Sequence, residues 1–101
     1  QSKNKLKGDR KMVVKNLHNT GVRPAPTGYG SWLEWWMDQK GVTKTPDCAN
    51  HACGKRAILG GHVKKDSSDD NAWYIVPLCD GCNKLEDPFT VSAADMAAIN
   101  P

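Results

Sequence analysis

Four cysteines supply the clearest chemistry in this sequence. They fall as two close pairs, Cys48 with Cys53 and Cys79 with Cys82. Pairs of thiolates at such spacings can converge on one ion, and zinc suits four sulfurs because it takes tetrahedral geometry with Zn–S bonds of about 2.3 Å. Four thiolate ligands leave no open coordination position, so we expect a structural zinc rather than a catalytic one.

Three other uses of these residues stay open at this stage. His51 could replace Cys53 as a ligand, each pair could form a disulfide, or the four sulfurs could hold an iron–sulfur cluster. No export signal is visible, so we expect a cytoplasmic protein, and a reducing compartment favours metal binding over disulfides.

Size and composition explain why a metal would be needed. The chain has 101 residues, of which 39% are hydrophobic and 7% aromatic. This length excludes a large Rossmann or barrel enzyme, and no apolar run is long enough to span a membrane. Ordering the backbone costs about 1–2 kcal/mol of conformational entropy per residue, and a core this small buries little apolar surface to offset it. Domains of this kind therefore commonly need disulfides or a bound metal ion.

The elements around the cysteines can be read from local signals. Ser31 and Glu34 form a capping box, and Gly41 stands at a helix C-terminus, which predicts a helix over residues 32–40. Its tryptophans, at positions 32, 35 and 36, share one face and are expected to pack in the core, although stacking on nucleobases is the alternative.

Two strands are expected between the cysteine pairs, over residues 56–63 and 73–76, and they would form a β-hairpin. A short helix is expected to begin near Cys82, and a further helix over about 93–99. Each cysteine pair with its turn would form a zinc knuckle. The order of knuckle, hairpin, second knuckle and helix is that of a treble-clef zinc finger. We therefore predict an α+β fold, a small zinc-stabilised treble-clef (ββα) domain over 30–101 with an extra N-terminal Trp-rich helix and a C-terminal helix.

Charge is concentrated before that domain. Residues 1–23 carry seven basic side chains against one acidic side chain, a net charge of +6, whereas the remaining 78 residues carry seven basic and ten acidic ones, a net charge of −3. Residues 1–29 thus read as a basic arm and a Pro/Gly linker, which is either a solvated tail or a contact for phosphates. The candidate nucleic-acid contacts are Lys3, Lys5, Lys7, Arg10 and Lys11 in the arm, and Lys55, Arg56, Lys64 and Lys65 beside the hairpin.

Residues 48–87 resemble the zinc-bearing members of the HNH, or His-Me finger, endonuclease superfamily. The resemblance rests on the cysteine pairs, on the segment Gly60-Gly61-His62-Val63 and on Cys79-Asp80-Gly81-Cys82-Asn83. It implies that His62 is a general base and that Asn83 binds a catalytic Mg²⁺ or Mn²⁺ for phosphodiester hydrolysis. At the position before His62, where that family carries a metal-binding Asp, this chain has Gly61.

The segment over residues 30–95 also resembles short bacterial zinc proteins without an established activity, through its Gly-Ser-Trp-Leu, Gly-x-His-Val and Trp-Tyr-Ile-Val-Pro-Leu-Cys motifs. Two hypotheses follow. The first is an HNH-like module that binds or cleaves nucleic acid. The second is a non-catalytic zinc module that contacts another protein, in which His62 is a structural histidine and Asn83 satisfies the start of a helix.

Overall fold

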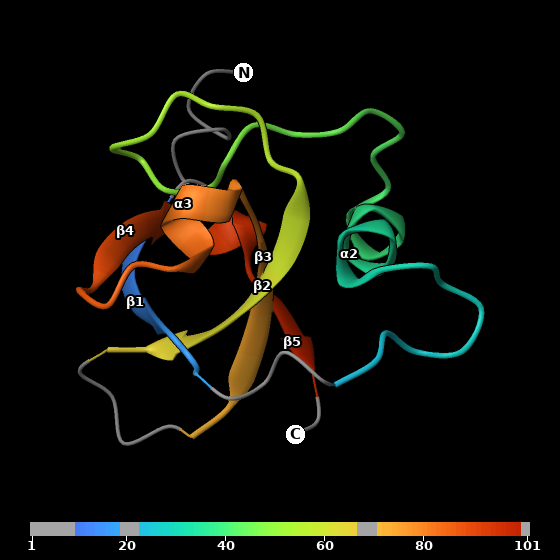
Figure 1. Ribbon diagram of the computed structural model, residues 1–101, viewed down its shortest axis with the longest axis horizontal. Coiled ribbons are helices and arrows are strands. Elements are labelled where there is room, and N and C mark those ends of the chain that lie inside the picture. Colours follow the sequence, from blue (N-terminus) through green and yellow to red (C-terminus); the bar gives the residue numbers. More distant parts are fainter. Residues whose placement is uncertain (1–9, 19–22, 67–70, 100–101) are drawn as a thin grey trace.

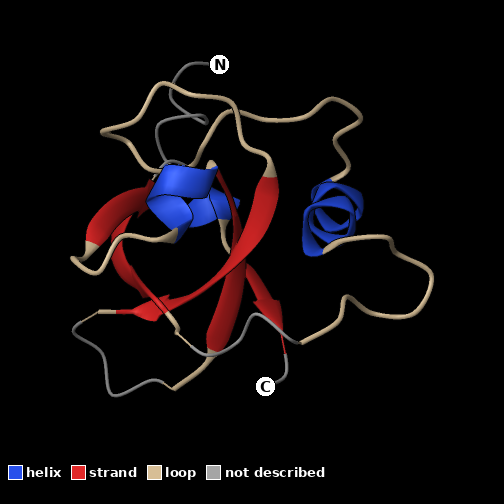
Figure 2. Ribbon diagram, viewed as in Figure 1, coloured by secondary structure: helices blue, strands red, loops and turns tan. Residues whose placement is uncertain are grey.

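The structure is a computed structural model, and it describes residues 10–18, 23–66 and 71–99. Within them the chain forms five strands, two short α-helices and one 3-10 turn (Figures 1 and 2). In chain order these elements are β1 (Lys11–Asn16), α2 (Trp32–Lys40), β2 (Leu59–Lys65), β3 (Trp73–Leu78), α3 (Asp80–Asn83), β4 (Phe89–Ser92), η1 (Ala93–Asp95) and β5 (Ala97–Ile99).

All five strands belong to one antiparallel sheet in the order β4-β1-β2-β3-β5. The expected hairpin is present at its centre, where His62 of β2 lies opposite Ile75 of β3. The segment that begins at Lys11 pairs with both β2 and β4. It is therefore an interior strand of the sheet.

Alternation of side chains along the strands gives the sheet two different faces. One face, the cysteine face, carries Val14, Val63 and Val76, which pack with the cysteines in the larger buried cluster. The other face, the α2 face, carries Ile75 and Ala97, which pack against the tryptophans of α2. The fold thus has two small cores, one on each side of the sheet.

Helix α2 begins and ends where the sequence predicts. The Ser31 hydroxyl accepts a hydrogen bond from the Glu34 amide (3.1 Å), and Gly41 ends the helix in the left-handed region at φ 67°. Trp36 is buried, and its indole N–H donates to the Asp95 carbonyl (2.7 Å). The tryptophan-rich face is therefore packed on the sheet, as expected of a core face.

Gly60 and Gly61 permit close approach on both faces of β2. A Cβ at Gly60 would lie 2.8 Å from the backbone nitrogen of Leu33 in α2. A Cβ at Gly61 would lie 2.5 Å from Leu78 Cδ1 and 2.9 Å from Asn83 Oδ1 on the cysteine face. Any larger side chain at these two positions would clash with those atoms. Gly60 therefore allows α2 to pack closely on one face of β2, and Gly61 allows the α3 region to pack closely on the other.

The predicted fold class is wrong. The molecule is mainly a five-stranded antiparallel sheet, and its two α-helices have nine and four residues. A treble-clef domain would rest on a two-stranded hairpin and a substantial helix after the second knuckle, whereas α3 is a single turn. Pairing of β2 with β1 and of β3 with β5 extends the hairpin into a sheet, and this long-range pairing leaves no local signal.

The predicted C-terminal helix over residues 93–99 is also wrong. One 3-10 turn follows Ser92, and Ala97–Ile99 then pairs with β3 as strand β5. Trp36 and Lys40 of α2 donate to the carbonyls of Asp95 and Met96. Ser92 and the alanines favour a helix locally. These contacts stabilise an extended chain instead, together with the backbone hydrogen bonds that β5 makes along the edge of β3 not occupied by β2.

Two further expectations concern the molecule as a whole. The boundary at residue 30 between an arm and a zinc domain stays a prediction, although β1 on its N-terminal side contributes to the sheet. Among the residues that the structure describes, no helix is both long and apolar enough to cross a membrane.

Candidate metal centre

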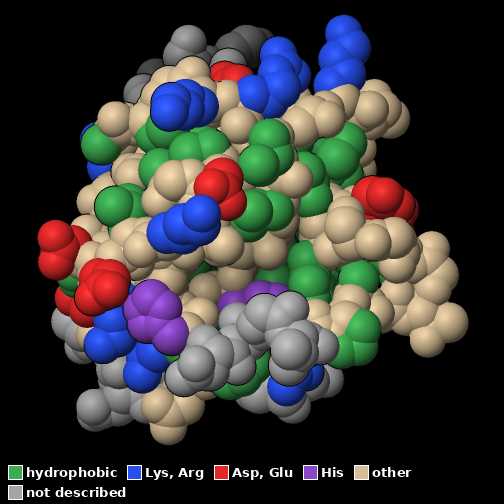
Figure 3. Space-filling view, in the orientation of Figure 1, with side chains coloured by type: hydrophobic (Ala, Val, Ile, Leu, Met, Phe, Trp, Pro, Cys, Tyr) green, Lys and Arg blue, Asp and Glu red, His purple; other side chains and the backbone are tan. Residues whose placement is uncertain are grey.

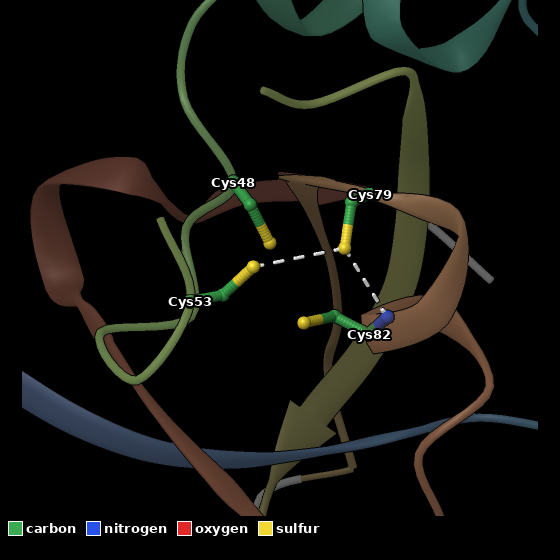
Figure 4. Close-up of side chains that lie close together, drawn as sticks. All are labelled: Cys48, Cys53, Cys79 and Cys82. Atoms are coloured by element: carbon green, nitrogen blue, oxygen red, sulfur yellow. Dashed lines mark hydrogen bonds between the residues drawn. The ribbon is translucent and has the colours of Figure 1, made fainter. Parts of the chain in front are cut away.

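The four cysteines come from two segments that the sheet brings together. Cys48 and Cys53 lie in the loop between α2 and β2, Cys79 follows the last residue of β3, and Cys82 lies in α3. Figure 4 shows the four side chains pointing toward a common centre from these two segments. The hairpin β2–β3 therefore joins the two pairs, as the sequence predicts.

Their sulfur atoms form a compact group. All four Sγ atoms lie within 4.8 Å of one another, and the cysteines are free rather than joined in disulfides. Cys48, Cys79 and Cys82 are buried, and Cys53 is partly buried. Four soft ligands in a largely dry pocket at this spacing could hold one metal ion, which supports a structural zinc-type site.

Backbone hydrogen bonds fix the first pair against the sheet. The Cys48 amide donates to the Lys55 carbonyl (2.8 Å), which closes the loop on itself. The Ala49 amide donates to Pro77 of β3 (2.8 Å), and the His51 amide donates to Thr90 of β4 (2.9 Å). The loop is thus held over two strands that are not neighbours in the sheet.

A second layer of donors surrounds the sulfurs. The amides of Lys55 and Cys82 donate to Cys53 Sγ and Cys79 Sγ, both at 3.4 Å. The buried Asn50 donates from Nδ2 to Cys82 Sγ (3.4 Å), while its Oδ1 accepts from the Ala52 amide (3.0 Å). Donors of this kind orient metal ligands and reduce the repulsion between thiolates.

The thiols differ in acidity because their surroundings differ. The hydrogen bond from the Cys82 amide lowers the pKa of Cys79 to about 7. Burial raises the pKa of Cys82 to about 12, and burial also raises the pKa of Cys48. One thiol therefore ionises near neutral pH, whereas the buried ones need a cation to displace their protons, and metal binding would release protons.

The alternative ligand His51 is engaged elsewhere. It is exposed, and its Nε2 forms a hydrogen bond of 3.0 Å with Ser92 Oγ of β4. Over residues 10–18, 23–66 and 71–99, the cysteine group is the one convergence of three or more His, Cys, Asp or Glu ligands. The structure thus offers no comparable group for the catalytic Mg²⁺ or Mn²⁺ that the resemblance implies.

His62 and Asn83, the two residues to which the resemblance assigns catalysis, are not brought together. The Asn83 side chain lies on the cysteine face, beside the position where Gly61 would carry a Cβ. His62 follows Gly61 in the same strand, so its side chain points to the opposite face. There its ring contacts Trp32 of α2, with ring centroids 5.0 Å apart. The sheet itself separates the two side chains.

His62 lies in an aromatic environment. It is 7% exposed, its ring stands edge-to-face with Trp32 and Trp73, and its Nε2 is buried without a hydrogen-bond partner among the residues that the structure describes. Burial, followed by the charge of Arg23, lowers the pKa of His62. This environment therefore favours the neutral imidazole.

The candidate basic residues lie in different places. Lys3, Lys5 and Lys7 lie outside the described residues. Arg10 and Lys11 are exposed at the start of β1, and Lys64 lies on the α2 face of β2. Lys65 points to the cysteine face, with its Nζ 5.6 Å from the Tyr74 ring centroid. Lys55 and Arg56 belong to the knuckle loop, where the Arg56 Nη1 donates to the Thr45 carbonyl.

Sequence reasoning missed three residues that shape the site and its surroundings. Lys15 shares a face with Lys11 and lies directly opposite Lys64, and the alternation in Lys-Met-Val-Val-Lys was the available signal. Arg23 lies over the Trp73 ring at 4.9 Å. Asn50 bonds to a cysteine sulfur. No spacing rule marks these last two residues, because their partners are distant in the sequence.

Comparison with known proteins leaves the chain without an assigned family: no protein-family model, curated protein or solved structure matches it. The resemblance to HNH endonucleases is therefore supported only as far as the four clustered cysteines.

Proposed function

We propose that this chain is a small zinc-stabilised module that binds nucleic acid through its phosphate backbone. The four-cysteine site supports the first half of this proposal, because a tetrathiolate ion is coordinatively closed and acts by holding the fold. The opposite placement of His62 and Asn83 favours binding over hydrolysis.

The second half of the proposal, binding to nucleic acid, rests on one surface of the molecule. Lys11, Lys15 and Lys64 point outward from the sheet beyond the area that α2 covers, and we call them the open-face lysines. Lys15 and Lys64 lie side by side across the β1–β2 pairing. None of the three forms an ion pair with a residue that the structure describes.

Basic side chains predominate around these lysines. Strands β1, β2 and β4 contain no Asp or Glu, although Asp66 follows β2 and its amide donates to the Val13 carbonyl of β1 (3.0 Å). The outward positions of β4 carry Thr90 and Ser92. Hydroxyl groups and lysines are the side chains that most often contact phosphate oxygens. By contrast, basic and acidic side chains are interspersed on the face seen in Figure 3. Lys84, unlike the open-face lysines, forms an ion pair, with Asp80 of α3 at 3.0 Å.

The part of the basic arm that precedes β1 adds positive charge next to these lysines in the sequence. It is rich in lysine and leads directly into β1, whose outward side chains include two of the open-face lysines. Each phosphate that a lysine neutralises releases counterions, so binding should weaken steeply with salt, with a slope in log–log form of about −0.9 per contact on duplex DNA.

The test is binding of a labelled duplex, measured by fluorescence anisotropy at several salt concentrations. We expect binding at low salt, and we expect the double variant Lys15→Gln/Lys64→Gln to weaken it and to reduce the salt slope by about 2. Lys44→Gln is the matched control, because Lys44 is exposed in the loop after α2. No binding by the wild type at low salt would refute the proposal and favour a protein-contact module.

A further inference from the structure

A pocket lies between α2 and the edge strand β5. Its volume is about 360 Å³, and it is lined by Arg23, Pro24, Pro26, Trp32, Trp35, Ala98 and Ile99. This volume is within the range of small-molecule sites, about 300–1,000 Å³. The walls are aromatic and apolar, and one cation stands among them.

The two tryptophans form a rigid corner. Their ring centroids are 5.4 Å apart and their planes meet at 82°. The Trp32 indole N–H donates to the Arg23 carbonyl (3.1 Å), which fixes both the ring and the segment that carries the two prolines. A flat aromatic ligand could therefore enter without large rearrangement of the walls.

The positive charge of Arg23 determines which ligand charge the pocket favours. Its guanidinium rests on the Trp73 ring, 4.9 Å from the centroid, and it forms no ion pair with a residue that the structure describes. No acidic side chain lines the pocket. A methylated ammonium group, which aromatic rings can also enclose, would be repelled by this cation. The lining thus favours a ligand with a flat ring and an anionic group.

Arg23 lies between the pocket and the strand that carries Lys64. Its guanidinium rests on the Trp73 ring, and the centroid of that ring lies 6.1 Å from the centroid of the His62 ring. Lys64 and His62 are two residues apart on the same face of β2, a separation of about 7 Å along a strand. A nucleic-acid backbone that follows the lysines would therefore arrive at Arg23.

We infer that this pocket takes an unpaired nucleobase of a single-stranded nucleic acid, with the adjoining phosphate on Arg23. This inference rests on the proposed function and makes it more specific. Stacking of bases on aromatic side chains tolerates any base sequence, and paired bases inside a duplex cannot enter such a pocket. The module should therefore prefer single strands to duplexes.

The test compares a ten-nucleotide oligo-dT, a duplex of the same length and thymidine monophosphate. Tryptophan fluorescence and anisotropy are measured for the wild type and two variants. Ile99→Phe enlarges a pocket-lining side chain on the α2 face of β5, and Ile58→Phe is the matched control, because Ile58 is an exposed isoleucine that does not line the pocket. We expect oligo-dT to quench the emission and to bind about tenfold or more tighter than the duplex.

Ile99→Phe should remove that preference and leave duplex binding unchanged, whereas Ile58→Phe should behave as the wild type. If Ile99→Phe does not fold, Arg23→Gln serves instead and should weaken oligo-dT binding more than duplex binding. Equal affinity of the wild type for both oligonucleotides, or an Ile99→Phe variant with unchanged preference, overturns the inference alone. Failure to bind either oligonucleotide at low salt overturns the proposed function as well. Quenching by the monophosphate alone, with equal oligonucleotide affinities, would show a nucleotide pocket unrelated to strand binding and also overturns the inference.

Discussion

At the scale of single residues, the spacing of the cysteines marked the candidate metal site, but it did not identify the residues that position the sulfur atoms. Cys79 and Cys82 were recognisable because a two-residue gap is a metal-site signal in itself. Asn50 was not, since it reaches Cys82 Sγ only after the loop has folded over the sheet. The sequence singled out His62, but the face of β2 on which it lies became evident only from the contacts of Gly61 and His62 on opposite faces.

Asn50 should stabilise the metal centre from outside the ligand set. Asn50→Ala removes the hydrogen bond to Cys82 Sγ and leaves the Ala52 amide without its side-chain acceptor. We expect a loss of about 1–3 kcal/mol in the free energy of unfolding, together with faster transfer of the metal to a competing chelator. Urea denaturation and chelator kinetics measure these effects. The control is the exposed Asn71→Ala, and equal behaviour of the two variants would argue against a supporting role for Asn50.

His62 should make stability depend on pH. Burial, and then the Arg23 charge, lower its pKa in the folded state. The neutral form is thus favoured by folding, and this contribution is full above the unfolded pKa of about 6.5 and is lost as the pH falls through the folded value. His62→Phe keeps an aromatic ring at this site but cannot be protonated.

We therefore expect the free energy of unfolding to fall less between pH 7.5 and 5.5 in His62→Phe than in the wild type. Protonation of the cysteines weakens both proteins alike, so the difference between them isolates the histidine. Parallel profiles for the wild type and His62→Phe would mean that the imidazole does not change its charge on unfolding.

At the scale of elements, local signals located the hairpin and α2, and long-range pairing decided the rest. Ser31 and Gly41 mark the ends of α2 by chemistry that acts within a few residues. The strands β1 and β5 are stabilised by partners far along the chain, Lys64 for Lys15 and Ile75 for Ala97. This is why the sheet could not be read from the sequence, and why a helix was predicted where β5 lies.

The contact between α2 and the sheet depends on the missing side chain of Gly60. In Gly60→Ala the new Cβ would lie 2.8 Å from the Leu33 nitrogen and 2.9 Å from Trp32 Cβ, so the helix must move. We expect a loss of about 1–3 kcal/mol in the free energy of unfolding and a changed near-ultraviolet spectrum of the tryptophans. Gly54→Ala is the control, because a Cβ there meets nothing within 4 Å. Equal stability of both variants would contradict the close packing described for α2.

At the scale of the whole molecule, the four cysteines bring the loop before β2 next to the end of β3. Backbone hydrogen bonds hold the same loop to β3 and β4, and a metal ion bound by the four sulfurs would add a direct link between the two segments. The chain has little core on either face of the sheet. A structural zinc contributes an apparent 10–16 kcal/mol in small zinc domains, roughly as much as the whole stability of an ordinary domain, so the metal should decide whether this chain folds.

Loss of one of the four cysteines should also weaken metal binding and lower the stability of the fold. Cys53→Ser replaces the least buried of the four thiols and leaves three sulfurs. We expect weaker metal binding and a melting temperature lower by ten degrees or more, since each kcal/mol is worth roughly 4–8 °C in a domain of this size. Thermal melts with metal analysis test this, and Ser31→Ala, which removes only a helix cap worth about 1 kcal/mol, is the control. A Cys53→Ser variant as stable as Ser31→Ala would show that Cys53 is not a ligand.

The most direct test of the account is the thermal unfolding curve of the purified chain, followed by circular dichroism with and without a zinc chelator. If one ion bound by the four cysteines stabilises the fold, the chelator should abolish the cooperative transition or move it down by tens of degrees, and added zinc should restore it. An identical curve in the presence of the chelator would contradict the central claim.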